Sequence, residues 1–339
     1  MTNEAVARAA RTPAAPRRGL RRRLGDLVTA LLVIGLLKLI LHLPERLMWT
    51  MAGVGGRMSY RFSRARREHA GRNLRRVLDW MVANGQGAES IRAAATDPRT
   101  FNALLRSAFV NHALYYVEMA RVPKFDAAWV DARLVVENPA EVEAWLVPGK
   151  ALILIGMHFG AIEVPGIFAV SRVKRLVSPM ESVSNARIQR YIYATRDTVG
   201  IRILNLGEAA TELLAALHHN EAVGLVADRV LTGSGMDVEL FGAPTKIPAG
   251  PVLLCAETDA PVCMSAVRRT GPGRYRGGVR QLAPAQGATR RERSRAMARA
   301  EAGLFEPFII EAPEQWLALF HPIWPDLEQP AMQSKGKQA

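Results

Sequence analysis

The sequence has few cysteines, and the residues around them argue against a metal site. Only two occur in 339 residues, Cys255 and Cys263, both in apolar surroundings and without Cys-x-x-Cys spacing or neighbouring histidines. This pattern predicts small hydrophobic side chains buried in a reducing compartment and argues against a zinc site. We therefore expect no metal ligands.

Acidic residues are also scarce relative to basic ones, at 31 Asp and Glu against 45 Lys and Arg, for a net charge of +14. Such an excess attracts polyanions, which include nucleic acid, anionic lipid headgroups and phosphate-bearing substrates. The sequence has no zinc-finger spacing and no strand of interleaved aromatic and basic residues, which argues against nucleic acid. It also lacks Gly-x-Ser-x-Gly, which argues against a serine hydrolase.

One long apolar run is present, from Leu27 to Leu43, interrupted by Lys38 and His42. As a helix it would span about 25 Å, short of the roughly 30 Å hydrocarbon core of a bilayer. A secretory signal peptide is the alternative, but no small-x-small cleavage site follows. Arginines flank the run on both sides, so charge gives no orientation. We expect an anchor that dips into the cytoplasmic leaflet or barely crosses it, with the main body cytoplasmic.

Composition divides the chain into four parts. Residues 1–23 are rich in Ala, Pro and Arg and predict a disordered basic arm, 24–56 a membrane anchor helix, 57–328 one main domain, and 329–339 a disordered tail. Residues 58–83 alternate apolar and basic positions at helical spacing. They predict a helix with one buried face and one cationic face, which lies on an anionic membrane surface or is simply solvated.

Strand-like and helix-like segments alternate through the main domain. The expected strands are 129–137, the run from 152, and 172–177, 202–206, 222–227 and 260–267; the expected helices are 100–122, 139–146, 188–199, 209–218, 252–257 and 294–310. Such alternation predicts an α/β fold with a mainly parallel central sheet flanked by helices.

The strand that begins at Leu152 ends in a glycine-flanked loop that carries His158 and, five residues on, Glu163. The two residues would not share a face of one regular helix, so a turn must lie between them. Glu163 can then accept a hydrogen bond from one ring nitrogen of His158, while the other takes a proton from a substrate hydroxyl. The Gly160-Ala161 amides are candidate oxyanion donors. The alternative is a loop histidine beside a carboxylate that caps a helix.

This arrangement resembles the His-x4-Asp/Glu signature of the membrane glycerolipid and glycolipid acyltransferases. Four further places are similar to the branch that contains the lipid A lauroyl/myristoyl and phosphatidylinositol mannoside acyltransferases. They are Arg67 to Leu74, Tyr115 to Glu118, Ala227-Asp228-Arg229 with 237–242 and 248–251, and Ala312 to Trp316.

The resemblance implies an acyltransferase that moves a fatty acyl chain from acyl-CoA or acyl carrier protein to a glycolipid hydroxyl, without a resident cofactor. The Asp-Arg pair followed by Gly-x-Asp-Val-Glu-Leu-Phe-Gly is closer to the phosphatidylinositol mannoside branch, which implies that acceptor type and acyl-CoA as co-substrate. Lipid A biosynthesis is the alternative within the family, and a non-catalytic basic protein of the membrane surface is the alternative outside it. We expect a monomer on the cytoplasmic face of a bacterial inner membrane.

The resemblance also implies roles for individual residues. His158 is the base and Glu163 orients it. Arg196 belongs to the active site, where a guanidinium group suits phosphate. Glu239 contacts the acceptor sugar, and Asp228 and Arg229 frame the pocket at a strand end, where α/β sheets place their sites. The alternative for Arg196 is a solvated helix face, and for Glu239 an ordinary edge strand.

Overall fold

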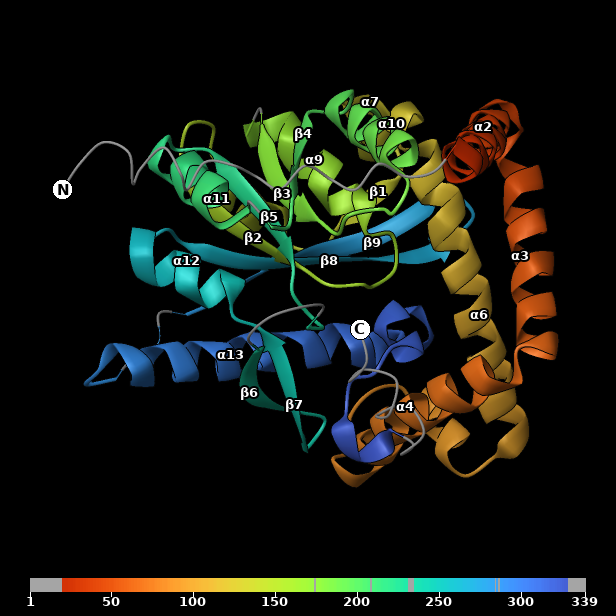
Figure 1. The fold of residues 1–339 in the computed structure, drawn as a ribbon. Helices are drawn as coiled ribbons and strands as arrows, with labels where there is room; N and C mark the ends of the chain where they lie inside the picture. Colours follow the sequence, from red (N-terminus) through yellow and green to blue (C-terminus); the bar gives the residue numbers. More distant parts are fainter. Residues whose placement is uncertain are drawn as a thin grey trace.

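The computed structural model describes residues 20–328 except 174, 208, 231–234, 284 and 286. The expected tail and residues 1–19 of the expected basic arm lie outside the described residues, whereas residues 20–23 form the first turn of a helix. A seven-stranded sheet forms the centre of the molecule, and long N-terminal helices stand at one flank (Figure 1).

The sheet has the strand order β1-β9-β8-β2-β5-β3-β4. Every neighbouring pair is parallel except β8 and β9, which form an antiparallel hairpin, so the predicted fold class is confirmed. The strands are β1 Leu134–Val136, β2 Leu152–Gly156, β3 Leu176–Met180, β4 Ile201–Asn205, β5 Ala222–Val226, β8 Val262–Gly271 and β9 Arg274–Gln281.

Helices cover both faces of this sheet, as the side chains of β2 show. Ile153 and Ile155 belong to one apolar cluster, which includes residues of α11, α12 and α13, whereas Leu152 and Leu154 belong to a second cluster with α8 and α9. Burial on both faces explains why β2 is a continuous apolar run rather than an alternating one. The helices are α8 Pro139–Trp145, α9 Glu163–Val173, α10 Ala186–Asp197, α11 Ala209–His218, α12 Gly250–Thr258 and α13 Arg290–Glu311.

Two expected strands are wrong over part of their length. In 129–137, a short helix α7, Ala127–Asp131, comes first, because the Asp126 carboxylate accepts a hydrogen bond from the Trp129 amide at 2.7 Å and caps it. In 172–177, Arg172 still belongs to α9, and the strand begins only at Leu176. A separate hairpin, β6 Gly235–Leu240 and β7 Ala243–Pro248, packs against α13.

Four long helices of the described chain form most of the flank and precede the first strand of the sheet. They are α2 Leu20–His42, α3 Glu45–Phe62, α4 Arg64–Ala83 and α6 Pro98–Arg121, with a short α5, Glu89–Arg92, between the last two. Helix α2 is about 34 Å long, which exceeds the length of about 25 Å expected for the apolar run 27–43, and the anchor helix expected over 24–56 is divided between α2 and α3. Its segment Leu24–His42 is long and apolar enough to cross a membrane.

The helix expected over 58–83 is divided at Ser63 into the end of α3 and the whole of α4. Several arginines of α4 contact the protein itself. Arg66 lies over the Phe320 ring, Arg75 lies over the Phe101 ring, and Arg76 pairs with Asp326. Part of the cationic face of α4 therefore forms contacts within the protein rather than facing solvent or a membrane.

Candidate active site

The candidate site lies where β2 and β5 end. These neighbouring parallel strands pair in register up to Gly156 and Val226, and two residues beyond each strand the chain places His158 and Asp228. The Nδ1 atom of His158 is 2.6 Å from Oδ1 of Asp228, and the His158 amide donates to Oδ2 at 3.0 Å. Nε1 of Trp316 also donates to Oδ2, at 2.8 Å. Three donors thus fix the Asp228 carboxylate.

The electrostatics favour an ionised Asp228. Its side chain is fully buried, and burial alone would raise its pKa. The charge of His158 and the hydrogen bonds from His158 and Trp316 outweigh burial, and together they hold the pKa of Asp228 below its usual value. An ionised carboxylate at Nδ1 keeps the proton on that nitrogen, which leaves Nε2 as the basic nitrogen. The His158 side chain is 20% exposed, so a substrate can reach it.

Glu163 does not accept this hydrogen bond, so the predicted pairing of His158 with Glu163 is wrong. Glu163 is the first residue of α9, and its Oε1 accepts a hydrogen bond from Nη2 of Arg196 in the last turn of α10. The two side chains are 11% and 7% exposed. Glu163, five residues after His158, therefore binds Arg196. The pairing of β2 with β5 already brings Asp228 to the His158 imidazole.

Arg229 and Glu239 lie in different surroundings. Arg229 follows Asp228, is 17% exposed, and has Nη2 3.9 Å from the Glu181 carboxylate. Its Nε is buried and has no hydrogen-bond partner among the described residues. Burial raises the pKa of Tyr115; the charge of Glu163 also raises it, and those of Arg196 and Arg229 lower it, so these groups lie within electrostatic range of one ring.

Glu239 lies on the exposed side of β6. Its hairpin is on the side of α13 away from the seven-stranded sheet (Figure 1). The contact of Glu239 with an acceptor sugar stays a prediction.

The backbone amides expected to serve as oxyanion donors are occupied, so this expectation is wrong for the described conformation. The Gly160 amide donates to the Gln315 carbonyl at 2.9 Å, and the Ala161 amide donates to the Val267 carbonyl at 3.0 Å. Gly160 has a φ of +52°, and a Cβ there would lie 2.1 Å from the Val267 oxygen. Only glycine fits this close approach of the loop to β8.

Comparison with known proteins identifies the family of the chain. The model of the bacterial lipid A biosynthesis acyltransferase family matches residues 19–325. The chain belongs to this family. The acyltransferase is 29% identical over 241 residues to the phosphatidylinositol mannoside acyltransferase of Mycolicibacterium smegmatis. This match covers 70% of this chain and 74% of the relative.

Two relatives from Mycobacterium tuberculosis carry the same name. They are 27% identical (strain CDC 1551 / Oshkosh) and 29% identical (strain H37Rv) to the acyltransferase over 174 residues. Each match covers 50% of this chain and 54% of the relative, so the matched part spans about half the length of these two proteins.

A buried ion pair, absent from the sequence prediction, holds the His158 loop of the acyltransferase. Glu118 of α6 and Arg269 of β8 are 6% and 3% exposed, and Nε of Arg269 donates to Glu118 at 2.8 Å. Arg269 Nη2 also donates to the Gly160 carbonyl at 2.8 Å. The Gln315 side chain bonds both the amide and the carbonyl of Arg269, at 2.8 and 2.9 Å. We call Glu118, Arg269 and Gln315 the loop brace.

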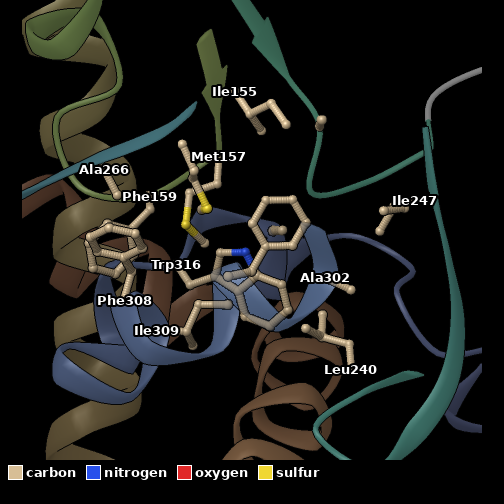
Figure 2. Packing of buried hydrophobic residues seen from close by; sticks show 14 of the residues in the cluster. Ile155, Met157, Phe159, Leu240, Ile247, Ala266, Ala302, Phe308, Ile309 and Trp316 are labelled. Atoms are coloured by element: carbon tan, nitrogen blue, oxygen red, sulfur yellow. The ribbon is translucent and has the colours of Figure 1, made fainter. Parts of the chain in front are cut away.

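Two residues of the loop brace could have been identified as candidates from the sequence. Glu118 and Gln315 lie in segments that resemble the family, whereas Arg269 carries no comparable mark. Trp316, in the same segment as Gln315, is fully buried. Figure 2 shows it in the apolar cluster between Met157 and Ile309. Its indole donor to Asp228 is therefore held by packing.

Proposed function

We propose that this acyltransferase moves a fatty acyl chain from acyl-CoA to a hydroxyl of a phosphatidylinositol mannoside-type glycolipid. The hydrogen bond between His158 and the buried Asp228, at an accessible strand end, is the observation that carries the chemistry. The names of the mycobacterial relatives support the acceptor. The family description supports the alternative, a lipid A-type acceptor.

In the proposed reaction His158 acts as general base. Nε2 takes the proton of the acceptor hydroxyl as its oxygen attacks the thioester carbonyl, and Asp228 stabilises the imidazolium that forms. Such proton transfer contributes about 10²- to 10⁴-fold. When the tetrahedral intermediate collapses, the carbon–sulfur bond breaks and the thiolate recovers the proton from His158. No covalent acyl-enzyme is required.

Arg229 is the proposed source of positive charge for the oxyanion or for a substrate phosphate. Its Nε is a buried donor without a partner among the described residues, and the residue adjoins Asp228 in the chain. A preorganised donor stabilises charge that develops in the transition state. The Glu163–Arg196 pair, close to Tyr115, is the proposed wall of the substrate pocket. The absence of a cofactor, the monomeric state and the cytoplasmic side of the membrane stay predictions.

Acyl transfer to purified lipid acceptors tests the proposal. With labelled acyl-CoA, the wild-type protein is expected to acylate phosphatidylinositol mannosides faster than a lipid A precursor. His158→Ala is expected to lower kcat at least about 10³-fold without unfolding the protein. The matched control is His219→Ala, an exposed residue just after α11, which should retain full turnover. Near-normal turnover by a folded His158→Ala variant would refute the mechanism.

Lipid mass spectrometry of a deletion strain tests the acceptor separately. The acylated species that disappears identifies the acceptor class. Loss of an acylated lipid A species, with mannosides unchanged, would replace the proposed acceptor by the alternative.

A further inference from the structure

Helix α3 has large apolar side chains on its outer face. Leu47, Met51, Val54, Met58 and Phe62 follow one another at spacings of four, three, four and four residues and are 44 to 74% exposed. This spacing puts them on one side of the helix. An exposed apolar row of this length marks a contact surface rather than ordinary protein exterior.

Apart from the buried Met48, the inner face of α3 carries small residues. Ala52, Gly53 and Gly56 are buried, and a Cβ on Gly56 would lie 2.6 Å from Cα of Val110 in α6. A helix of a soluble protein turns its large apolar side chains toward the core. In α3 this order is reversed, so its composition fits an apolar environment on the outside.

Helix α2 continues the same surface. Its exposed side chains include Leu24, Val28, Leu31, Leu32, Leu36 and Leu39, while Ala30 on the opposite side is 1% exposed. Both helices pack against α6, and Figure 1 shows them on the same flank, with α6 between α3 and the sheet. We call these six residues and the five of α3 the membrane platform.

Hydrogen bonds join α2 to the catalytic domain at both of its ends. Near the first end, Nδ2 of Asn185 donates to the Asp26 carbonyl at 2.6 Å; near the other, Nη1 of Arg121 donates to the Leu43 carbonyl at 2.9 Å. Asn185 caps α10, which carries Arg196. If α2 crossed the bilayer, its ends would lie at opposite interfaces, and the part of the protein that bonds both ends would have to enter the hydrocarbon, which is costly.

We propose that α2 and α3 lie in the plane of the bilayer, embedded together in one leaflet, and that α2 does not cross the membrane. The platform is then the surface through which the acyltransferase binds an anionic membrane. Arg46, Arg57 and Arg61 are exposed on α3 and have no ion-pair partner among the described residues. These arginines can pair with anionic lipid headgroups, which lie at the membrane–water interface.

Flotation of the full-length protein with sealed vesicles tests the surface. Vesicles of phosphatidylcholine with phosphatidylglycerol should bind the protein more tightly than phosphatidylcholine alone, because of the exposed arginines of α3. The double variant Met51→Glu/Met58→Glu is expected to lose about tenfold or more of the bound fraction, since two apolar side chains become charged. Leu253→Glu is the matched control: its side chain is 51% exposed on α12, outside the platform, and binding should not change.

A topology experiment tests the orientation. With tags at both ends of the chain, protease added to one side of sealed membranes should remove both tags or neither. Removal of one tag alone would show a crossing helix and overturn the in-plane arrangement. Unchanged flotation of the double variant, with loss of a dimer in sedimentation, would instead assign the surface to a second copy of the chain.

These outcomes are separate from those of the proposed function. Flotation and tag protection do not require turnover, and acyl transfer to a detergent-dispersed acceptor does not require a bilayer. The platform variants should keep such turnover, so failure of the chemistry and failure of the platform give different results.

Discussion

Replacing Asp228 by Asn tests the catalytic pair with almost no change in side-chain size. Asp228 accepts hydrogen bonds from His158 Nδ1, from the His158 amide and from Trp316 Nε1. An amide retains one accepting oxygen and gains an NH₂ group. If the NH₂ group faces Nδ1, the imidazole must carry its proton on Nε2 and cannot act as a base. If the oxygen faces Nδ1, the NH₂ group opposes the other two donors.

The expected loss of activity follows from these contacts. In a Ser-His-Asp triad, the same change costs about 10⁴ in kcat because the histidine takes the wrong tautomer. That factor corresponds to about 5.5 kcal/mol of transition-state stabilisation. Opposed buried donors cost about 1 to 3 kcal/mol each in stability. We therefore expect Asp228→Asn to lose 10³- to 10⁴-fold in kcat and to melt at a lower temperature, while remaining folded.

Continuous detection of the released CoA thiol gives kcat, and intrinsic tryptophan fluorescence during thermal unfolding reports folding. Asp237→Asn is the control, because that aspartate lies on β6 with 86% of its side chain exposed. If Asp228→Asn stays within about tenfold of wild type while Glu163→Gln abolishes turnover, the assignment of the carboxylates is reversed.

The remaining predictions concern the carboxylates of Glu118, Glu163 and Glu301. Glu118→Gln weakens the loop brace and is expected to lower kcat about 10- to 100-fold with little change in KM. Arg268→Gln, next to Arg269 but on the surface, should leave kinetics unchanged, and equal effects would contradict the brace. Glu163→Gln is expected to raise KM for the lipid acceptor more than it lowers kcat, as steady-state kinetics will show; a selective loss of kcat would contradict its place in the pocket wall. Burial raises the pKa of Glu301, which is fully buried without a partner among the described residues, well above its usual value of 4.5. The folded state then binds the proton more tightly than the unfolded state, so stability falls as pH rises above 4.5. Glu301→Met is expected to add about 2 to 4 kcal/mol to the unfolding free energy at pH 8 and less at pH 5. Unfolding in denaturant at the two pH values measures both gains. An equal gain at both pH values would show that protonation of Glu301 does not affect stability.

Much of the fold could be predicted, because burial leaves a mark on local sequence. The expected helix over 209–218 has the observed bounds, and the apolar run from Leu152 is a central strand. Strand β9 could not be found in this way. Its sequence, Arg-Tyr-Arg-Gly-Gly-Val-Arg-Gln, is polar and rich in glycine, and it becomes a strand by pairing with β8. The apolar segment from 129 misled because Trp129 stacks on Phe125 in a short helix, with ring centroids 4.0 Å apart.

The candidate site divides in the same manner. His158 could be predicted, since it stands directly after a buried strand. Its partner could not, because Asp228 is 70 residues away and reaches His158 only through the pairing of β2 with β5, which the sequence does not state. Glu163 was the nearer carboxylate in the chain, and proximity along the chain was the wrong guide. Asp228 was expected in the pocket from its position at a strand end, but without this role.

The C-terminal segment gives the site an order of assembly during synthesis. Gln315, Trp316 and Leu317 bond Gly160, Asp228 and His158 in turn, so residues that follow the whole sheet in the chain hold the proposed catalytic histidine, which precedes most of it. A nascent chain that has the whole sheet but ends before residue 315 holds an unsupported imidazole and an aspartate without its indole. The support of both side chains therefore depends on a segment that is synthesised after the whole sheet.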